Sequence, residues 1–242
     1  MAILEKVSTT QLIIDYILDK IRDGDWKSGD QLPNERDFAA ELGVSRMPVR
    51  EAFASLSALG IIEAKQGSGT YIREYDSNMV AQIMSVYSVL GKTSARDVFE
   101  TRAVLESFAV RLMIERATDE EIEEFGKQLE RARDFIVVLE HAKDPESERK
   151  KFQKLNNFHR SIALGTKNQF LVQFSDSIRV MTRQFFDQSN VDHVETFKQG
   201  YIGHEQIYQA IKDRNKDLAQ KLIYQHLMDE LDFFEKNRKQ DE

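Results

Sequence analysis

The stretch Gly29–Ile72, GDQLPNERDFAAELGVSRMPVREAFASLSALGIIEAKQGSGTYI, decides how the first third of this chain folds. It holds two of the three prolines and several glycines, so its elements are short and separated by turns. Asn34 and Ser45 each stand where a side chain can cap a helix. Gly43 and Gly60 stand where these helices would end. The stretch therefore predicts two short helices that meet at a glycine turn.

The sequence pattern changes after the second of these helices. Ile61–Ala64 and Thr70–Arg73 are short β-type runs, and the glycine-rich segment Lys65–Gly69 joins them as a hairpin loop. Upstream, Ser8–Arg22 has apolar residues at helical spacing behind a Ser/Thr cap. Three helices followed by a hairpin are typical of a winged helix-turn-helix, a DNA-binding fold.

The second helix of the pair has the composition of a recognition helix. Val49, Phe53 and Leu56 fall on one face, while Arg46 and Arg50 lie four residues apart on a neighbouring stripe. The planar guanidinium of arginine can pair with guanine or hold a phosphate. The alternative is an ordinary helical domain with solvated arginines, because such Arg pairs are common on helix surfaces.

Composition limits the class of protein. The chain has 242 residues, 41% hydrophobic and 31% charged, which is enough for two folded domains. No apolar run approaches the roughly 18 residues of a membrane span, and the N-terminus lacks a signal-peptide pattern. There is no cysteine, so we expect a cytoplasmic protein without disulfides. Because the net charge is -7, DNA binding requires locally concentrated positive charge.

Only helices are predicted beyond Glu74-Tyr75-Asp76. The expected fold class is mainly α: residues 1–75 form the winged helix-turn-helix with its small β-hairpin, and residues 76–242 form an all-α helical bundle. Helix breaks are expected near Gly91, Ala117-Thr118, Asp144-Pro145, Gly165, Asn190 and Asp213.

Three of the five histidines fall inside predicted long helices among apolar residues: His159, His204 and His226. Facing helices of a bundle commonly build metal sites, and three imidazoles suit Zn(II), Ni(II) or Mn(II). The alternative is that each histidine is a satisfied packing residue. His141 and His193 stand near predicted helix ends in polar company and are interpreted as surface residues.

Residues 17–73 resemble the DNA-binding domain of the GntR superfamily. The motifs that carry the resemblance are Gly29-Asp30, Leu32-Pro33, Glu35-Arg36, Gly43-Val44-Ser45-Arg46, Pro48-Val49-Arg50-Glu51 and the wing Gly-x-Gly-Thr. Met47 stands where such proteins often have a smaller or polar residue. The resemblance implies that operator DNA is contacted by Arg36, Ser45, Arg46, Arg50, Gln66 and Gly67.

The second part of the chain is similar to the FCD ligand-binding domain, which defines the FadR subfamily of these regulators. The similarity lies in Phe99–Leu112, Asn156–Leu171 and His204–Leu227. Many FCD domains hold a divalent metal with one Asp and three His, and use the metal to chelate a carboxylate effector. The resemblance implies that the histidine ligands here are His159, His204 and His226.

The aspartate of that ligand set is missing. A helix expected over Asn156–Leu164 places Leu155 one turn before His159, where the family has its Asp; Asn156 is the nearest polar substitute and the candidate fourth ligand. Loss of an anionic ligand weakens metal affinity, so a three-histidine metal site and a metal-free pocket both stay open. Arg102 matches the family arginine that takes an effector carboxylate. Its alternative role is an i,i+4 ion pair with Glu106.

Together these features predict a homodimeric transcription repressor, not an enzyme. It would bind a palindromic operator and sense a small carboxylic acid in its helical domain. One alternative is a metal-free sensor of a larger acyl ligand, or an activator in place of a repressor. A remote alternative is a metal-dependent hydrolase in which the three histidines activate water, although no HExxH motif is present.

Overall fold

The computed structural model describes residues 7–155, 157–187 and 193–237. It divides into two compact units, Met1–Met79 and Val80–Glu242. The division falls inside helix α4 (Ser77–Gly91), shortly after the boundary expected at residue 75.

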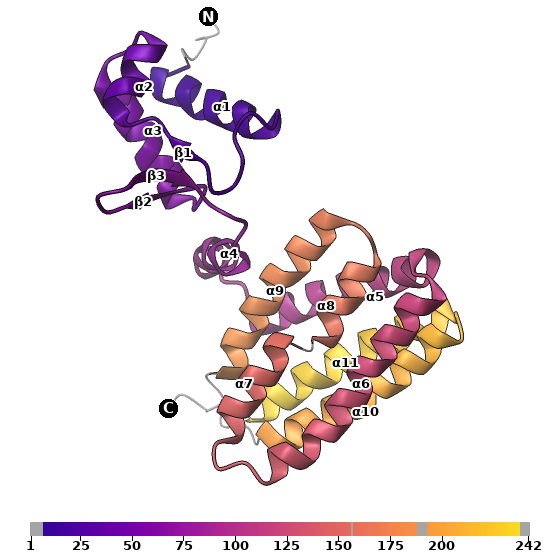
Figure 1. The fold of residues 1–242 in the computed structure, drawn as a ribbon. Coiled ribbons are helices and arrows are strands. Elements are labelled where there is room, and N and C mark those ends of the chain that lie inside the picture. The colour runs from indigo at the N-terminus through magenta and orange to yellow at the C-terminus, as the bar shows by residue number, and fades with distance from the viewer. Residues whose placement is uncertain (1–6, 156, 188–192, 238–242) are drawn as a thin grey trace, which may run out of the picture. The chain divides into compact units, whose positions relative to one another are not determined.

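The first unit contains the three predicted helices and a small sheet (Figure 1). Its helices begin at capping residues: the Ser8 side chain accepts from Gln11 N, and the Asn34 side chain accepts from Arg36 N and Asp37 N. Gly43, in the left-handed conformation at φ 66°, ends the second helix. In chain order the elements are α1 (Thr9–Arg22), β1 (Gln31–Leu32), α2 (Glu35–Leu42), α3 (Arg46–Ala58), β2 (Ile62–Lys65) and β3 (Gly69–Ile72).

The sheet has the order β1-β3-β2, with both pairs antiparallel. The hairpin of β2 and β3 is the predicted wing. Strand β1 was not predicted, because two residues are too few to show an alternating pattern. Gly69 lies at φ 121°, and a Cβ there would collide with Gln31 Nε2, which donates to Ser68 O at 2.7 Å. The β1 side chain therefore fixes the tip of the wing.

The core of the first unit is built from the predicted face of α3 and a cluster of aromatic rings. Val49 and Leu56 are fully buried, and Phe53 is nearly so. Trp26 and Phe53 both pack against Phe38, with ring centroids 6.0 and 5.8 Å away. Seating α3 on this core leaves its arginine stripe in solvent.

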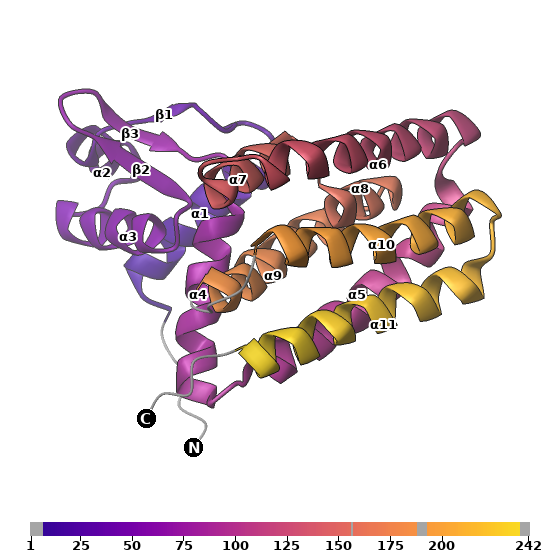
Figure 2. The same cartoon turned by 90° about the horizontal axis from the view of Figure 1, so that it is seen from below.

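Within the described residues the second unit is entirely helical. Its helices are the rest of α4, followed by α5 (Ala95–Arg116), α6 (Asp119–Glu140), α7 (Pro145–Leu155), α8 (Phe158–Gly165), α9 (Gln169–Asp187), α10 (His193–Lys212) and α11 (Lys216–Asn237). Helix α5 packs against α8, α9 and α11, and it runs beside α11 (Figure 2). No described helix is both long enough and apolar enough to cross a bilayer.

Most predicted breaks in this unit are confirmed. Capping boxes at Ser94 and Thr118 begin α5 and α6, and helices end at Gly91, Gly165 and Lys212. The break expected at Asn190 lies outside the described residues.

The helix expected over Asn156–Leu164 is wrong in its first part. Helix α7 ends at Leu155, and α8 begins at Phe158 with Asn157 as its cap. The Asn157 side chain accepts from Arg160 N at 3.1 Å, and this bond replaces the backbone bond of a continuing helix. Leu155 and His159 therefore belong to different helices, not to successive turns of one.

Candidate functional site

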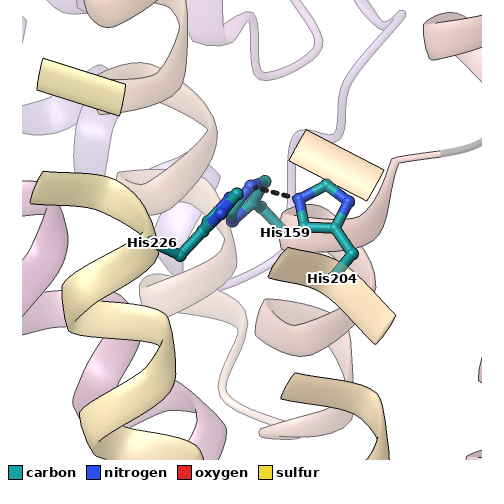
Figure 3. A group of neighbouring side chains, drawn as sticks. All are labelled: His159, His204 and His226. Carbon is teal, nitrogen blue, oxygen red and sulfur yellow. Dashed lines mark hydrogen bonds between the residues drawn. The ribbon is translucent and has the colours of Figure 1, made fainter. Parts of the chain in front are cut away.

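Three histidines from three helices come together in the second unit. His159 of α8, His204 of α10 and His226 of α11 point toward one another (Figure 3), and their ligand nitrogens all lie within 4.8 Å. The closest pair is His159 Nε2 and His204 Nε2, at 3.1 Å. The structure thus brings together residues that are far apart in the sequence.

Neighbouring groups hold these rings in place. His159 Nδ1 is 2.5 Å from a carboxylate oxygen of Glu106, which leaves Nε2 directed at the other two histidines. Metal-binding histidines are commonly oriented by such a carboxylate. The His204 ring stacks on Phe158 with centroids 3.9 Å apart. A Cβ at Gly203 would lie 2.5 Å from His226 Nδ1, so the bare glycine allows α10 to approach the His226 ring.

Arg102 and two carboxylates form a buried network beside the histidines. Arg102, 6% exposed, donates from Nε to Glu106 at 2.8 Å and from Nη1 to Glu230 at 3.1 Å. The i,i+4 ion pair that the sequence left as an alternative is therefore present. Arg102 also lines the adjacent cavity, and its Nη2 makes no hydrogen bond within the described part of the chain.

Burial and neighbouring charges set the protonation states of this cluster. Burial raises the pKa of the Glu106 carboxyl, but His159 and the Arg102 guanidinium lower it by more, so the pKa lies below its ordinary range. Burial lowers the pKa of His159 more than the Glu106 carboxylate raises it. Burial, with the adjacent His226 and His159, holds the pKa of His204 well below its ordinary value. Glu106 is therefore an anionic carboxylate, and His159 and His204 are neutral imidazoles, the form that binds metals.

The donor set fits a divalent metal ion. His226 Nε2 is buried and makes no hydrogen bond among the described residues, although the Glu230 carboxylate oxygen Oε1 lies 3.4 Å from it. Buried polar atoms without partners are rare and call for an explanation, and an ion held by three imidazoles supplies one. The candidate fourth ligand Asn156 lies outside the described residues, as does the side chain of Leu155. His141 is exposed at the end of α6, and the side chain of His193 lies outside the described part of the chain.

A cavity of about 800 Å³ opens beside the cluster. Arg102, His159 and His226 line its polar part. Phe152 and Phe197 contribute apolar surface. Such a mixture of apolar walls and a few converging polar groups is typical of a small-molecule site.

The predicted DNA contacts lie on the surface of the first unit. Arg46 and Arg50 are exposed on α3, and the Arg36 side chain is 76% exposed. Arg36 and Arg46 line one hollow together with residues of β1 and β3. Ser45 occupies the capping position of α3, but its hydroxyl makes no cap hydrogen bond and is exposed. Helix N-termini with such donors suit phosphate groups.

The wing contributes the other predicted contacts. Gln66 and Gly67 are exposed in the turn between β2 and β3, where Gly67 has φ 73°. Lys65 is less available than its position in the sequence indicates, because it pairs with Glu63 at 2.9 Å and lies over the Tyr71 ring.

Some residues of the site were missed by reasoning from the sequence. Glu106 was considered only as a partner of Arg102, not as the group that orients His159. Glu230 was not considered, although its i,i+4 spacing from His226 was a usable signal. Arg179, which lines the cavity, was not considered, although its i,i+4 spacing from Arg183 was a usable signal.

Comparison with known proteins decides the family. The model of the FCD domain matches residues 97–229, and that of the bacterial regulatory proteins of the gntR family matches residues 9–72. The chain belongs to the GntR regulators with an FCD domain. Two matched domains therefore account for both the winged helix and the helical unit, and they confirm the predicted fold class.

Relatives of this GntR/FCD chain are regulators as well. It is 29% identical to the HTH-type transcriptional regulator LutR of Bacillus subtilis, over 90% of this chain and 99% of that protein. It is 28% identical to an Escherichia coli protein named for regulation of the L-lactate dehydrogenase operon, over 88% of this chain and 83% of that protein.

Among solved structures it resembles Streptococcus agalactiae GntR, with a TM-score of 0.65 and 26% identity over 90% of this chain and 97% of that one. The family and these relatives are DNA-binding transcription regulators, not enzymes, so the hydrolase alternative is dropped.

The Glu106 network yields a stability prediction. Glu106→Gln removes the charge that pairs with Arg102 and that accepts the hydrogen bond of His159, and breaking a buried ion pair costs about 3 kcal/mol or more. We expect urea denaturation, followed by far-UV circular dichroism, to shift clearly to lower urea. The control is Glu115→Gln on the same helix, where the carboxylate is at the surface and pairs with Lys216. Equal midpoints for the two variants would contradict a stabilising role for the network.

Proposed function

We propose that this regulator is a cytoplasmic repressor whose operator affinity is controlled by a small carboxylic acid, bound at a divalent metal in the FCD domain. The observation that carries the proposal is the cluster of three imidazoles, two of which, His159 and His226, line one cavity together with Arg102. Neutral imidazoles bind metals, and a guanidinium binds carboxylates, so the site offers two anchors for one acid.

His159, His204 and His226 would hold the metal. A Zn, Ni or Mn ion bound there would supply a Lewis acid for the carboxylate and the adjacent hydroxyl or keto oxygen of the effector. The other residues prepare the site: Glu106 fixes the His159 ring, and Gly203 leaves room for the His226 ring. Asn156 or water would complete the ligand set.

Arg102 would orient the effector. Two of its nitrogens are already bonded to carboxylates, and Nη2 is the donor that remains for the acid. A small hydroxy- or keto-acid suits this site, because it can chelate the metal and accept one hydrogen bond from Arg102 Nη2. The relative named for the L-lactate dehydrogenase operon is consistent with this class of effector.

The DNA contacts would come from both elements of the winged helix. Arg46 and Arg50 would read bases or phosphates in the major groove, and Ser45 would bond a phosphate at the start of α3. Arg36, Gln66 and Gly67 would contact the DNA from α2 and from the wing. Their exposure supports these roles, since a buried side chain could not reach a duplex.

The active form would be a homodimer, because a two-fold protein matches a palindromic operator and doubles the phosphate contacts. Helix α5 offers a face for the second copy. Val104 and Phe108 lie one turn apart on it and are 62% and 54% exposed, opposite the face that packs in the core. Large exposed apolar side chains that lie together are typical of interfaces.

A metal-free sensor of a larger acyl ligand is the second candidate. The size of the cavity and its phenylalanine lining favour it, because a three-carbon acid fills only a small part of about 800 Å³. The metal content of the protein separates the two candidates.

The metal prediction uses two glycines of α10. The full chain, purified without a metal-affinity tag, should hold near one divalent ion per chain by elemental analysis. Gly203→Ala would push a Cβ against the His226 ring, and we expect metal affinity to fall about tenfold or more. Gly200→Ala is the control, since a Cβ there meets nothing within 4 Å. No metal in the wild type after reconstitution, or equal affinity in both variants, would contradict the metal site.

The operator prediction concerns α3. The operator is first selected by the wild-type protein from random duplexes. Arg50→Ala should then weaken operator binding by about 1–3 kcal/mol and relax the base preference, because a base contact carries both affinity and specificity. The control is Arg22→Ala, an exposed arginine at the end of α1. Unchanged affinity and base preference in Arg50→Ala would remove this residue from the proposed contacts.

The effector prediction tests whether binding of an acid in the FCD domain changes operator binding by the winged helix. With metal bound and salt fixed, L-lactate should weaken operator binding by about 1–3 kcal/mol, a typical coupling between two sites. Fluorescence anisotropy of a labelled operator duplex measures it. Tighter binding would identify an activator. Unchanged operator affinity while calorimetry detects bound lactate would refute regulation through this acid.

A further inference from the structure

Helix α9 places a second set of cations in the effector cavity. Arg179, Thr182 and Arg183 line the cavity on successive positions of one helix face. The same face reaches the Arg102 network, because Arg102 Nη1 lies 3.5 Å from Thr182 Oγ1. The α9 cations therefore stand next to the group proposed to hold the effector carboxylate.

The positive charge of Arg179 is poorly compensated. Within the described residues its one ion-pair partner is Asp176, at 3.7 Å, which is too long for a hydrogen bond. Asp176 bonds instead to Arg160, with 3.1 Å between Arg160 Nε and the other carboxylate oxygen. One carboxylate thus serves two guanidinium groups. Arg179 Nε and Asp176 Oδ1 are both buried without a hydrogen-bond partner in the described part of the chain.

The positive charge of Arg102 in this cavity, in contrast, is fully neutralised by carboxylates. It bonds two carboxylates, those of Glu106 and Glu230, at 2.8 and 3.1 Å. Arg179 is also largely buried, with 16% of its side chain exposed, and has no such bond. Burial and the nearby Arg102 charge lower the pKa of Arg179 to about 10.

A buried cation without a close partner is costly, and an anionic ligand would remove the cost. Arg183 adds a further positive charge on the same wall. Within the described residues it makes no ion pair. The α9 wall therefore offers two guanidinium groups that no carboxylate of the described chain neutralises closely.

We propose that Arg179 and Arg183 form a second anion subsite, so that the natural effector carries two anionic groups. One carboxylate would bind at the histidine cluster and Arg102, and the second group, a carboxylate or a phosphate, would bind the α9 arginines. This inference rests on the proposed function, because it takes the cavity to be the effector site. It narrows the effector class from monocarboxylic acids to acids with a further negative group.

Two matched pairs of probes test the subsite by calorimetry on the full, metal-loaded chain. L-Malate differs from L-lactate by a carboxylate, and 3-phosphoglycerate differs from glycerate by a phosphate. We expect the doubly anionic member of at least one pair to bind about tenfold tighter, the size of one hydrogen bond to a charged group. The pair that shows the preference identifies the second group as carboxylate or phosphate.

Variants assign the preference to α9. Arg179→Gln should abolish it, and Arg183→Gln, at an exposed position, should reduce it without affecting folding. The control is Arg133→Gln, which removes an exposed guanidinium of α6 that does not line the cavity and does not touch Asp176. The control should keep the wild-type preference.

Equal affinities within both pairs, binding of none of the probes, or a preference that Arg179→Gln retains would each overturn the subsite. Failure of the proposed function has a different signature. In that case operator affinity would not respond to bound acid, or the chain would hold no metal, while the charge preference and its loss in Arg179→Gln would persist.

Discussion

The structure of the helical FCD domain depends on one buried carboxylate, that of Glu106. It lies on the face of α5 that packs in the core, and it bonds both Arg102 and His159. Neither a lone carboxylate nor a lone guanidinium can be buried at that depth without a large desolvation penalty. The pairing thus fixes the α5 face against α8, and through Arg102 it reaches Glu230 of α11 and Thr182 of α9.

This network explains why the cavity is polar at one end. An apolar core would pack α5 as well or better, since replacing buried ion pairs by hydrophobic residues is often stabilising. Buried charged residues are expected at this end of the cavity if they orient a ligand. Glu106 orients the His159 ring and also forms an ion pair with Arg102. Arg102 in turn bonds a second carboxylate, that of Glu230, so its positive charge is already neutralised. The less compensated cation of the cavity is therefore Arg179, on the next helix along the wall.

The sequence predicted what local chemistry determines. Helix caps such as Asn34 and the apolar face of α3 follow from residue type and spacing. The three histidines share no short-range spacing and were predicted as ligands through the resemblance to the FCD domain. Strand β1 was missed because it owes its existence to pairing with β3, not to its own two residues. The break before α8 was missed because Asn157 reads equally well as a helical residue or as a cap. The Glu106–His159 bond joins residues 53 positions apart, a contact that no spacing rule reveals.

Helix α9 connects the cavity with the start of the domain. Its inner face carries Arg179, and its other face packs Ile178 and Met181 against Ala81 of α4. Helix α4 is also the element in which the DNA-binding unit ends. A ligand that bonds only the histidines contacts α8, α10 and α11, whereas a ligand that also bonds Arg179 contacts α9. A ligand shifts an equilibrium only through contacts that differ between its states. An anion held by α9 would act on the helix whose Ile178 and Met181 share an apolar cluster with Ala81 of α4, whereas no residue of α8, α10 or α11 belongs to that cluster within the described part of the chain.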